Sequence, residues 1–142
     1  LLGPGPFIVA NAASFWIEGP RSNVARLIAA FDHARMDILM LVASTATSVG
    51  FDGPGDYALD TTGRLRRRRE REIVPFAYAG VLLIKPELFA GMPEIFSLNR
   101  LFDAAEARGR LFGQRLDGVW LHVGPPVAIA EAEARIALSA IA

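Results

Sequence analysis

The sequence contains no cysteine, no excess of charge of either sign and no long hydrophobic run. Without cysteine there is no disulfide, no thiolate metal site and no cysteine nucleophile, and such a chain suits a reducing compartment. Fifteen basic residues balance fifteen acidic ones, so no overall field attracts nucleic acid or a membrane surface. No apolar run approaches the roughly 20 residues that span a bilayer. We therefore expect a cytoplasmic protein that binds neither nucleic acid nor membrane.

Two familiar glycine motifs are also absent. The chain has neither G-x-x-x-x-G-K-[ST] nor G-x-G-x-x-G, the loops in which backbone amides cradle phosphates. The first residues, LLGPGPF, lack the basic segment and apolar core of a secretion signal. The sequence thus gives no direct indication of a nucleotide-binding loop or of a leader.

What is present is the pattern of one folded α/β domain, residues 1–142. Hydrophobic residues make up 52% of the chain, enough for a real core. Nearly continuous apolar runs, typical of strands covered on both faces, predict strands at 7–10, 38–43, 80–84 and 119–123. The spacing i, i+3, i+4, i+7 predicts helices between them, at 24–31 and 98–105, and a last helix is expected from Pro125 onward.

Capping residues and turn residues refine this pattern. Ser22 is a plausible N-cap for the first helix, Ser97 precedes the second and Gly109 is placed to end it. Residues 51–72 differ in character, because short strand-like pieces flank the turn sequence Thr61-Thr62-Gly63. We predict a solvent-facing β-hairpin inserted in the α/β domain at about 51–72.

The run RLRRRRER at 64–71 is the most conspicuous charge feature. It could grip phosphates of nucleic acid or of a nucleotide. However, acidic residues interrupt it, the whole chain is neutral and no aromatic platform lies within it. A solvated hairpin strand is therefore the favoured interpretation, with a single arginine contacting a phosphate as the remaining alternative.

Other polar residues allow two interpretations. Asp52 and Asp56 lie four apart in the glycine-rich loop FDGPGDY and could hold a hard cation, but the calcium-loop pattern is not matched and an ordinary turn is favoured. In WLHVGPP, strand alternation puts Trp120 and His122 on one face. His122 is either a site residue at a strand end or a histidine satisfied by neighbouring backbone, and the two are equally supported. His33, beside Asp32, is expected to be structural.

Two strand ends are expected to open on one edge of the sheet, at 11–14 and at 122–124. Ser14 and His122 would be close if their strands are neighbours, yet no acid is placed to orient the histidine, so no serine–histidine–acid triad is supported. The catalytic residues stay unknown at this point, and no substrate follows from these patterns alone.

Several stretches in one order resemble the bacterial sugar-1-phosphate nucleotidyltransferases, in particular N-acetylmuramate-1-phosphate uridylyltransferase and mannose-1-phosphate guanylyltransferase-like proteins. They are IVANAASFW, FDGPGDYALDTTGRLRRRRE, PFAYAGVLLIKPELF, FSLNRLFDAA and DGVWLHVGPPVAIAEAEA. The resemblance implies a Rossmann-like, mostly parallel sheet flanked by helices. It implies transfer of a nucleoside monophosphate from a nucleoside triphosphate to a sugar 1-phosphate, with magnesium and release of pyrophosphate. The family's amino-terminal triphosphate loop has no counterpart, so the chain resembles the carboxy-terminal portion alone.

Both magnesium positions of the family are altered. Where the family has Asn-Gly-Asp after the first strand, this chain has Asn11, Ala12 and Ala13, so Ala13 replaces a metal aspartate. His122 stands at the second aspartate position. Magnesium prefers oxygen ligands, which a methyl group cannot supply. The resemblance therefore predicts weak or absent transfer by this chain alone.

The resemblance also suggests what survives, namely the sugar-phosphate side. The implied substrate-binding residues are Asn11, Asp56, Tyr78, Gly80 and Asn99. The alternative is a non-catalytic domain that binds a sugar phosphate or nucleotide, or that completes a partner chain or forms a homo-oligomer, since an unpaired strand edge invites association.

Overall fold

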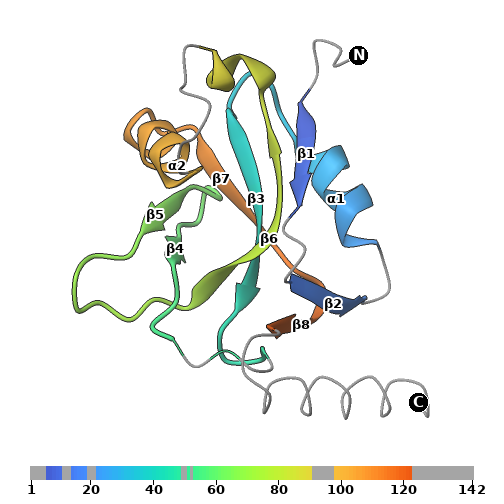
Figure 1. Ribbon diagram of the computed structural model, residues 1–142, viewed down its shortest axis with the longest axis vertical. Helices are drawn as coiled ribbons and strands as arrows, with labels where there is room; N and C mark the ends of the chain where they lie inside the picture. The colour runs from blue at the N-terminus through green and yellow to red at the C-terminus, as the bar shows by residue number, and fades with distance from the viewer. Residues whose placement is uncertain are drawn as a thin grey trace.

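The computed structural model describes residues 6–10, 14–18, 22–48, 51, 53–90 and 98–122 (Figure 1). Within these residues strands dominate, and helices separate some of them. In chain order the elements are β1 (Phe7–Ala10), β2 (Ser14–Glu18), α1 (Asn23–Ala30), β3 (Ile38–Ser44), β4 (Tyr57–Leu59), β5 (Leu65–Arg67), β6 (Phe76–Ile84), the short 3-10 helix η1 (Pro86–Phe89), α2 (Leu98–Ala107), β7 (Leu111–Arg115) and β8 (Gly118–His122).

The strands form two sheets. The larger has the order β5-β4-β6-β3-β7, with β1 also paired to β6, and β2 pairs with β8 in the smaller. Only β3 and β7 are parallel among the described pairs. The α/β class with an inserted hairpin is confirmed, but the sheet is mixed and not mostly parallel. A continuous apolar run indicates that a strand is buried on both faces. It does not indicate whether the strand runs parallel or antiparallel to its neighbours.

The helices cover opposite faces of the larger sheet. On one face α2 contributes Leu101 and Phe102 to a core with Met40 and Leu82. On the other, Leu27 of α1 packs among side chains that include those of β3 pointing the opposite way. Burying one such leucine contributes about 2 kcal/mol. Because alternate side chains of β3 enter the two cores, this one strand packs with both helices.

The two predicted helices that lie in the described residues are confirmed, with bounds within two residues of the predicted 24–31 and 98–105. The Ser22 hydroxyl accepts a hydrogen bond from the Ala25 amide at 3.3 Å and caps α1. Gly109 follows α2 with φ +70, a left-handed conformation that ends helices and favours glycine. Ser97 and the helix expected from Pro125 lie outside the described residues. No helix in the described part of the chain is long and apolar enough to cross a membrane.

Strand β6 carries a bulge that organises the sheet around it. Its pairing with β3 shifts register between Met40, which faces Leu82, and Val42, which faces Tyr78. Gly80 lies inside this bulge with φ +92, where a side chain would be strained. On its other edge, β6 pairs with β1 beyond the bulge and with β4 before it. The bulge thus leaves the Tyr78 region between two strand partners.

Candidate functional site

A cavity of about 130 Å³ opens between the hairpin, β6 and α2. Three of the five predicted substrate-binding residues meet there, although they are far apart in the chain: Asp56 before β4, Tyr78 on β6 and Asn99 on α2. The side chains that line the cavity are Asp56, Tyr57, Arg67, Tyr78, Asn99 and Phe102. The arrangement combines a carboxylate, a guanidinium, an amide and two phenols around one small space.

Asp56 is fixed in place by three hydrogen bonds. Its amide donates to the Phe76 carbonyl at 2.8 Å, and its own carbonyl accepts from the Arg68 amide at 2.9 Å. Its carboxylate oxygen Oδ2 accepts from the Tyr78 amide at 2.9 Å. The side chain therefore continues the strand pairing of β6 at the point where β4 begins. Within the described residues Oδ1 has no hydrogen-bond partner and can accept one from a ligand.

The two tyrosines stay neutral at physiological pH. Burial raises the pKa of Tyr78 to about 12, and burial, as the largest cause, also raises the pKa of Tyr57 far above its usual value. Tyr78 is held by an edge-on contact of its ring with Phe102, with centroids 5.7 Å apart. Neutral phenols can donate and accept hydrogen bonds, so both suit a ligand rich in hydroxyl groups.

Arg67 supplies the positive charge of the cavity. Its guanidinium donates to Asp103 of α2 at 2.9 Å, and this hydrogen bond raises the pKa of Arg67. Its amide donates to the Glu106 carboxylate at 2.8 Å, so β5 is tied to α2. Arg67 remains 44% exposed, which leaves it able to contact an anion beside the cavity.

The other arginines of the 64–71 run that make side-chain contacts hold the hairpin together or join it to the end of α2. Arg66 forms a bidentate pair with Glu72 at 2.9 and 2.7 Å. Arg64 donates to the Gly109 carbonyl at 2.9 Å, and Arg68 donates to the Glu72 carbonyl at 2.9 Å. These contacts agree with the hairpin interpretation of the run. That the chain binds no nucleic acid stays a prediction.

The remaining predicted residues are placed differently. Gly80 is not among the described lining residues and instead forms the bulge beside Tyr78. Asn11 and Ala13 lie outside the described residues. His122 ends β8 opposite Ser14 of β2, so the expected proximity of these two positions is confirmed, although Ser14 begins a strand that the sequence pattern did not reveal.

No metal centre is evident in the described part of the chain, where no group of three or more histidine, cysteine, aspartate or glutamate residues could hold an ion. The acidic loop 51–57 contributes Asp56 to the cavity described above, while Asp52 lies outside the described residues. The preference for a turn over a cation site in that loop therefore stays a prediction.

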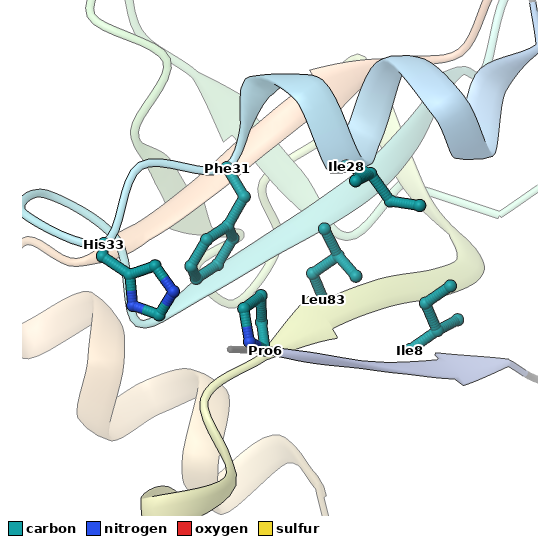
Figure 2. A pocket seen from close by; sticks show the side chains of 6 residues that line it. All are labelled: Pro6, Ile8, Ile28, Phe31, His33 and Leu83. Carbon is teal, nitrogen blue, oxygen red and sulfur yellow. The ribbon is translucent and has the colours of Figure 1, made fainter. Parts of the chain in front are cut away.

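An apolar cavity of about 330 Å³ lies elsewhere, between α1 and strand β1 (Figure 2). Ile8, Ile28, Phe31 and Leu83 point into the same space. Ile8 and Ile28 are 46% and 55% exposed, unlike the other core-facing residues of these elements. His33 lines this cavity as well and contacts the Phe31 ring edge-on, consistent with the structural role expected for it.

Two solved structures share the fold. One is a Bacillus anthracis protein assigned as a glucose-1-phosphate thymidylyltransferase and crystallised with sucrose; its TM-score is 0.67 at 16% identity, covering 94% of this chain and 55% of that chain. The other is the inositol-1-phosphate CTP transferase of T. maritima, with a TM-score of 0.56 at 14% identity, covering 89% and 52%. The chain therefore has the α/β fold of nucleotidyltransferases.

Sequence comparison then gives a curated relative. No protein-family profile matches the chain, but it is 44% identical over 138 residues to the N-acetylmuramate alpha-1-phosphate uridylyltransferase of Caulobacter vibrioides. The match covers 96% of this chain and 57% of that protein, so the chain spans little more than half the length of this relative. The chain is therefore similar, over nearly its whole length, to the carboxy-terminal portion of a sugar-1-phosphate nucleotidyltransferase.

Proposed function

We propose that this chain carries the sugar-phosphate side of a nucleotidyltransferase. The reaction transfers a nucleoside monophosphate from a nucleoside triphosphate to a sugar 1-phosphate and releases pyrophosphate. The observation that carries the proposal is the convergence of Asp56, Tyr78 and Asn99 on one cavity from three separate segments. The similarity to a uridylyltransferase, at 44% identity, supports the same conclusion.

The cavity residues divide the work of binding. The free oxygen Oδ1 of Asp56 accepts a hydrogen bond from a sugar hydroxyl, and the neutral phenols of Tyr57 and Tyr78 orient the ring. Arg67 lies where it can face the phosphate. At about 130 Å³ the cavity is smaller than the roughly 300 Å³ of a typical ligand pocket, so it accommodates part of the substrate, for which we propose the sugar.

The residues at the two family metal positions do not fit magnesium. Magnesium requires oxygen ligands in octahedral geometry, whereas Ala13 offers no ligand atom and His122 offers nitrogen. The register of β2 and β8 sets Ser14 opposite His122. Phosphoryl-type transfer depends on charge neutralisation. We therefore propose that the chain alone transfers weakly or not at all.

Pyrophosphate release tests the catalytic part of this proposal. The purified chain and its Ala13→Asp variant are incubated with magnesium, each of the four ribonucleoside triphosphates and a panel of sugar 1-phosphates. We expect no clear turnover from the unmodified chain. Turnover only in Ala13→Asp would locate the defect at one missing carboxylate, whereas efficient turnover by the unmodified chain would overturn the proposed impairment and would identify the substrates.

Binding tests the sugar-phosphate site independently of turnover. In an NMR titration with sugar 1-phosphates, the amides of Asp56 and Tyr78 should shift, and Asp56→Asn should weaken binding by roughly fivefold or more, because hydrogen bonds to a charged group are the stronger ones. The matched control is Glu70→Gln, which makes the same chemical change on an exposed loop residue. Equal binding by both variants would remove Asp56 from the site.

A second candidate function, completion of another polypeptide, is favoured by strand β1. Among the described residues β1 pairs with β6 and with no other strand. The backbone N–H and C=O groups along the other edge of β1 are therefore not used in strand pairing there. The apolar cavity of about 330 Å³ with half-exposed Ile8 lies at the same strand (Figure 2). A strand added from another polypeptide would pair with the free edge of β1, and an apolar side chain on that strand would fill the cavity.

Sedimentation analysis separates the forms that this second function could take. Self-association that is lost in Ile8→Lys would indicate a homo-oligomer formed at β1. A monomer that becomes active only with a second polypeptide would indicate a complementing chain, and a monomer that is active alone would argue against completion. A cytoplasmic location remains our expectation, because the chain has no cysteine.

A further inference from the structure

A second polar cavity, of about 310 Å³, shares no described lining residue with the first. Its polar walls are Ser44, Thr47, Ser48 and Arg115, and Phe76 lies beside them. No acidic residue is among the described residues that line it. Neither the resemblance to the family nor the function proposed above assigns a role to these side chains.

The position of this cavity in the fold is typical of ligand sites. β3 and β7 run parallel, with Val42 in register with Arg115, and both strands end at the cavity, β3 at Ser44 and β7 at Arg115. Figure 1 shows their arrowheads at the same end of the sheet. In open α/β sheets, ligands bind outside the carboxyl ends of parallel strands.

The Arg115 guanidinium is held in place without being neutralised. It lies over the Phe76 ring at 5.1 Å, a cation–π contact that orients the group. Within the described residues it forms no ion pair and donates no hydrogen bond, whereas Arg66, Arg67, Arg108 and Arg110 all pair with carboxylates. Its five N–H donors are therefore available, and a planar fork of donors matches a phosphate group.

Neighbouring groups add donors and positive charge. Ser44 has a hydroxyl without a partner in the described chain, and the Thr47 hydroxyl makes only a long contact of 3.5 Å to the Ser44 carbonyl. The guanidinium of Arg26 donates to the Arg115 carbonyl at 3.3 Å, which places a second cation at the end of β7. Two guanidinium groups therefore lie at this end of β7, although the chain as a whole is neutral.

We propose that this cavity binds the phosphate group of a small phosphorylated ligand. The guanidinium of Arg115 donates to two phosphate oxygens, and the hydroxyls of Ser44 and Thr47 donate to the others. The site is separate from the cavity of Asp56 and Tyr78, and the inference stands whether or not that cavity binds a sugar.

NMR titration of the full chain tests the proposal, with inorganic phosphate, pyrophosphate and glucose 1-phosphate as separate probes. Sodium chloride keeps the ionic strength constant, because weak anion binding is screened by salt. We expect saturable shifts of the Thr47, Ser48 and Leu116 amides. Saturation by inorganic phosphate would show that phosphate alone suffices, and saturation only by glucose 1-phosphate would show that the site requires the ester. Both results support the site.

Variants test whether Arg115 is responsible. Arg115→Ala should weaken binding about tenfold or more, as expected for loss of charge-assisted hydrogen bonds. Arg115→Lys should be intermediate, since it keeps the charge but loses the fork, and it serves as the second variant if Arg115→Ala folds poorly. Arg69→Ala, which removes the same charge from an exposed loop residue, should bind like the unmodified chain.

Three results would overturn the proposal. They are the absence of shifts at 44–48 and 115–116 with every probe, an equal loss of binding in Arg69→Ala, and unchanged binding in Arg115→Ala. Shifts confined to the amides around Asp56 and Tyr78 would also reject this site while leaving the proposed sugar-phosphate cavity intact. Conversely, loss of binding in Arg115→Ala but not in Asp56→Asn would support this site alone.

Discussion

The two ends of the parallel pair β3 and β7 use charge in opposite ways. At the amino end, Asp37 directly precedes β3. Its carboxylate forms ion pairs with Arg110 at 2.7 Å, Arg108 at 2.8 Å and Lys85 at 3.6 Å. At the carboxyl end, Arg115 faces a polar cavity and has no carboxylate partner within the described chain. At the amino end, which we call the closed end, the charges pair with one another. At the carboxyl end, which we call the open end, the guanidinium of Arg115 has no paired carboxylate within the described residues.

The closed end is built for stability. Asp37 is only 8% exposed. Burial by itself would raise the pKa of Asp37, but hydrogen bonds and charges from Arg110 and Arg108 outweigh it and hold that pKa below its usual value. Arg110 also donates to the carbonyls of His33 and Ala34 at 3.0 Å. The network joins the loop before β3 to the end of α2 and leaves little capacity for a ligand.

At these two ends of the parallel pair, the carboxylate partners of an arginine, and not its charge alone, separate a structural cation from the one that we propose to bind a ligand. Arg108, Arg110 and Arg115 lie within one short stretch and carry the same charge. The first two form ion pairs with Asp37. The third forms no ion pair within the described residues. Removing a group at each end should therefore affect different properties, stability at the amino end and ligand binding at the carboxyl end.

The largest effect is expected from Asp37→Asn. The substitution leaves three cations around a neutral group, and breaking a buried ion pair from one side costs about 3 kcal/mol or more. Because Arg108 and Arg110 are partly exposed, we expect about 2–3 kcal/mol of lost stability in urea unfolding. The control Asp103→Asn breaks the exposed pair with Arg67 and should cost about 1 kcal/mol or less. Equal losses in the two variants would contradict the contrast drawn here.

The pH dependence of that loss gives a finer test. The pKa of Asp37 is lowered on folding, so its contribution is fully present above the unfolded pKa of about 3.9. The contribution is lost as pH falls through the folded pKa. The stability difference between the unmodified chain and Asp37→Asn should therefore be constant from about pH 7 to pH 5 and shrink below about pH 4.

Urea unfolding at several pH values measures this difference directly. The Glu72 carboxylate, whose pKa is held at about 2 mainly by its hydrogen bond with Arg66, also loses its interaction in acid. Glu72 is present in both proteins, so its contribution cancels from the difference. A difference that grew as the pH fell would show that Asp37 does not stabilise through its charge.

The local parts of this fold could be predicted from the sequence. The bounds of β1 and the capping of α1 by Ser22 follow from apolar periodicity and from one hydroxyl. β2 and β7 were missed, because SFWIE follows closely on the first strand and LFGQR mixes polar residues into the pattern. Strand direction was also wrong in part, since it depends on long-range connections that no local pattern records.

The candidate site shows the same limit. Asp56, Tyr78 and Asn99 were grouped by resemblance to the family, because residues so far apart cannot be brought together by spacing rules. Tyr57 and Arg67 were missed, yet a signal existed: a hairpin turning around 61–63 pairs these two positions, as observed. Cross-strand partners share a face, so the predicted hairpin already placed Arg67 beside Tyr57.

The smallest effect is expected from Arg115→Ala in the absence of phosphate. The side chain is exposed and its one described side-chain interaction is the contact with Phe76, so stability should change by about 1 kcal/mol or less. In phosphate at constant ionic strength, the unmodified chain should gain stability because a ligand that binds the folded state stabilises it. Phosphate should not stabilise Arg115→Ala. It should stabilise Asp37→Asn as much as the unmodified chain, because that variant keeps the cavity at Arg115. If phosphate changes the stability of the two variants equally, the two ends of β3 and β7 do not differ in function. The contrast between arginines paired with Asp37 and the unpaired Arg115 would then be wrong.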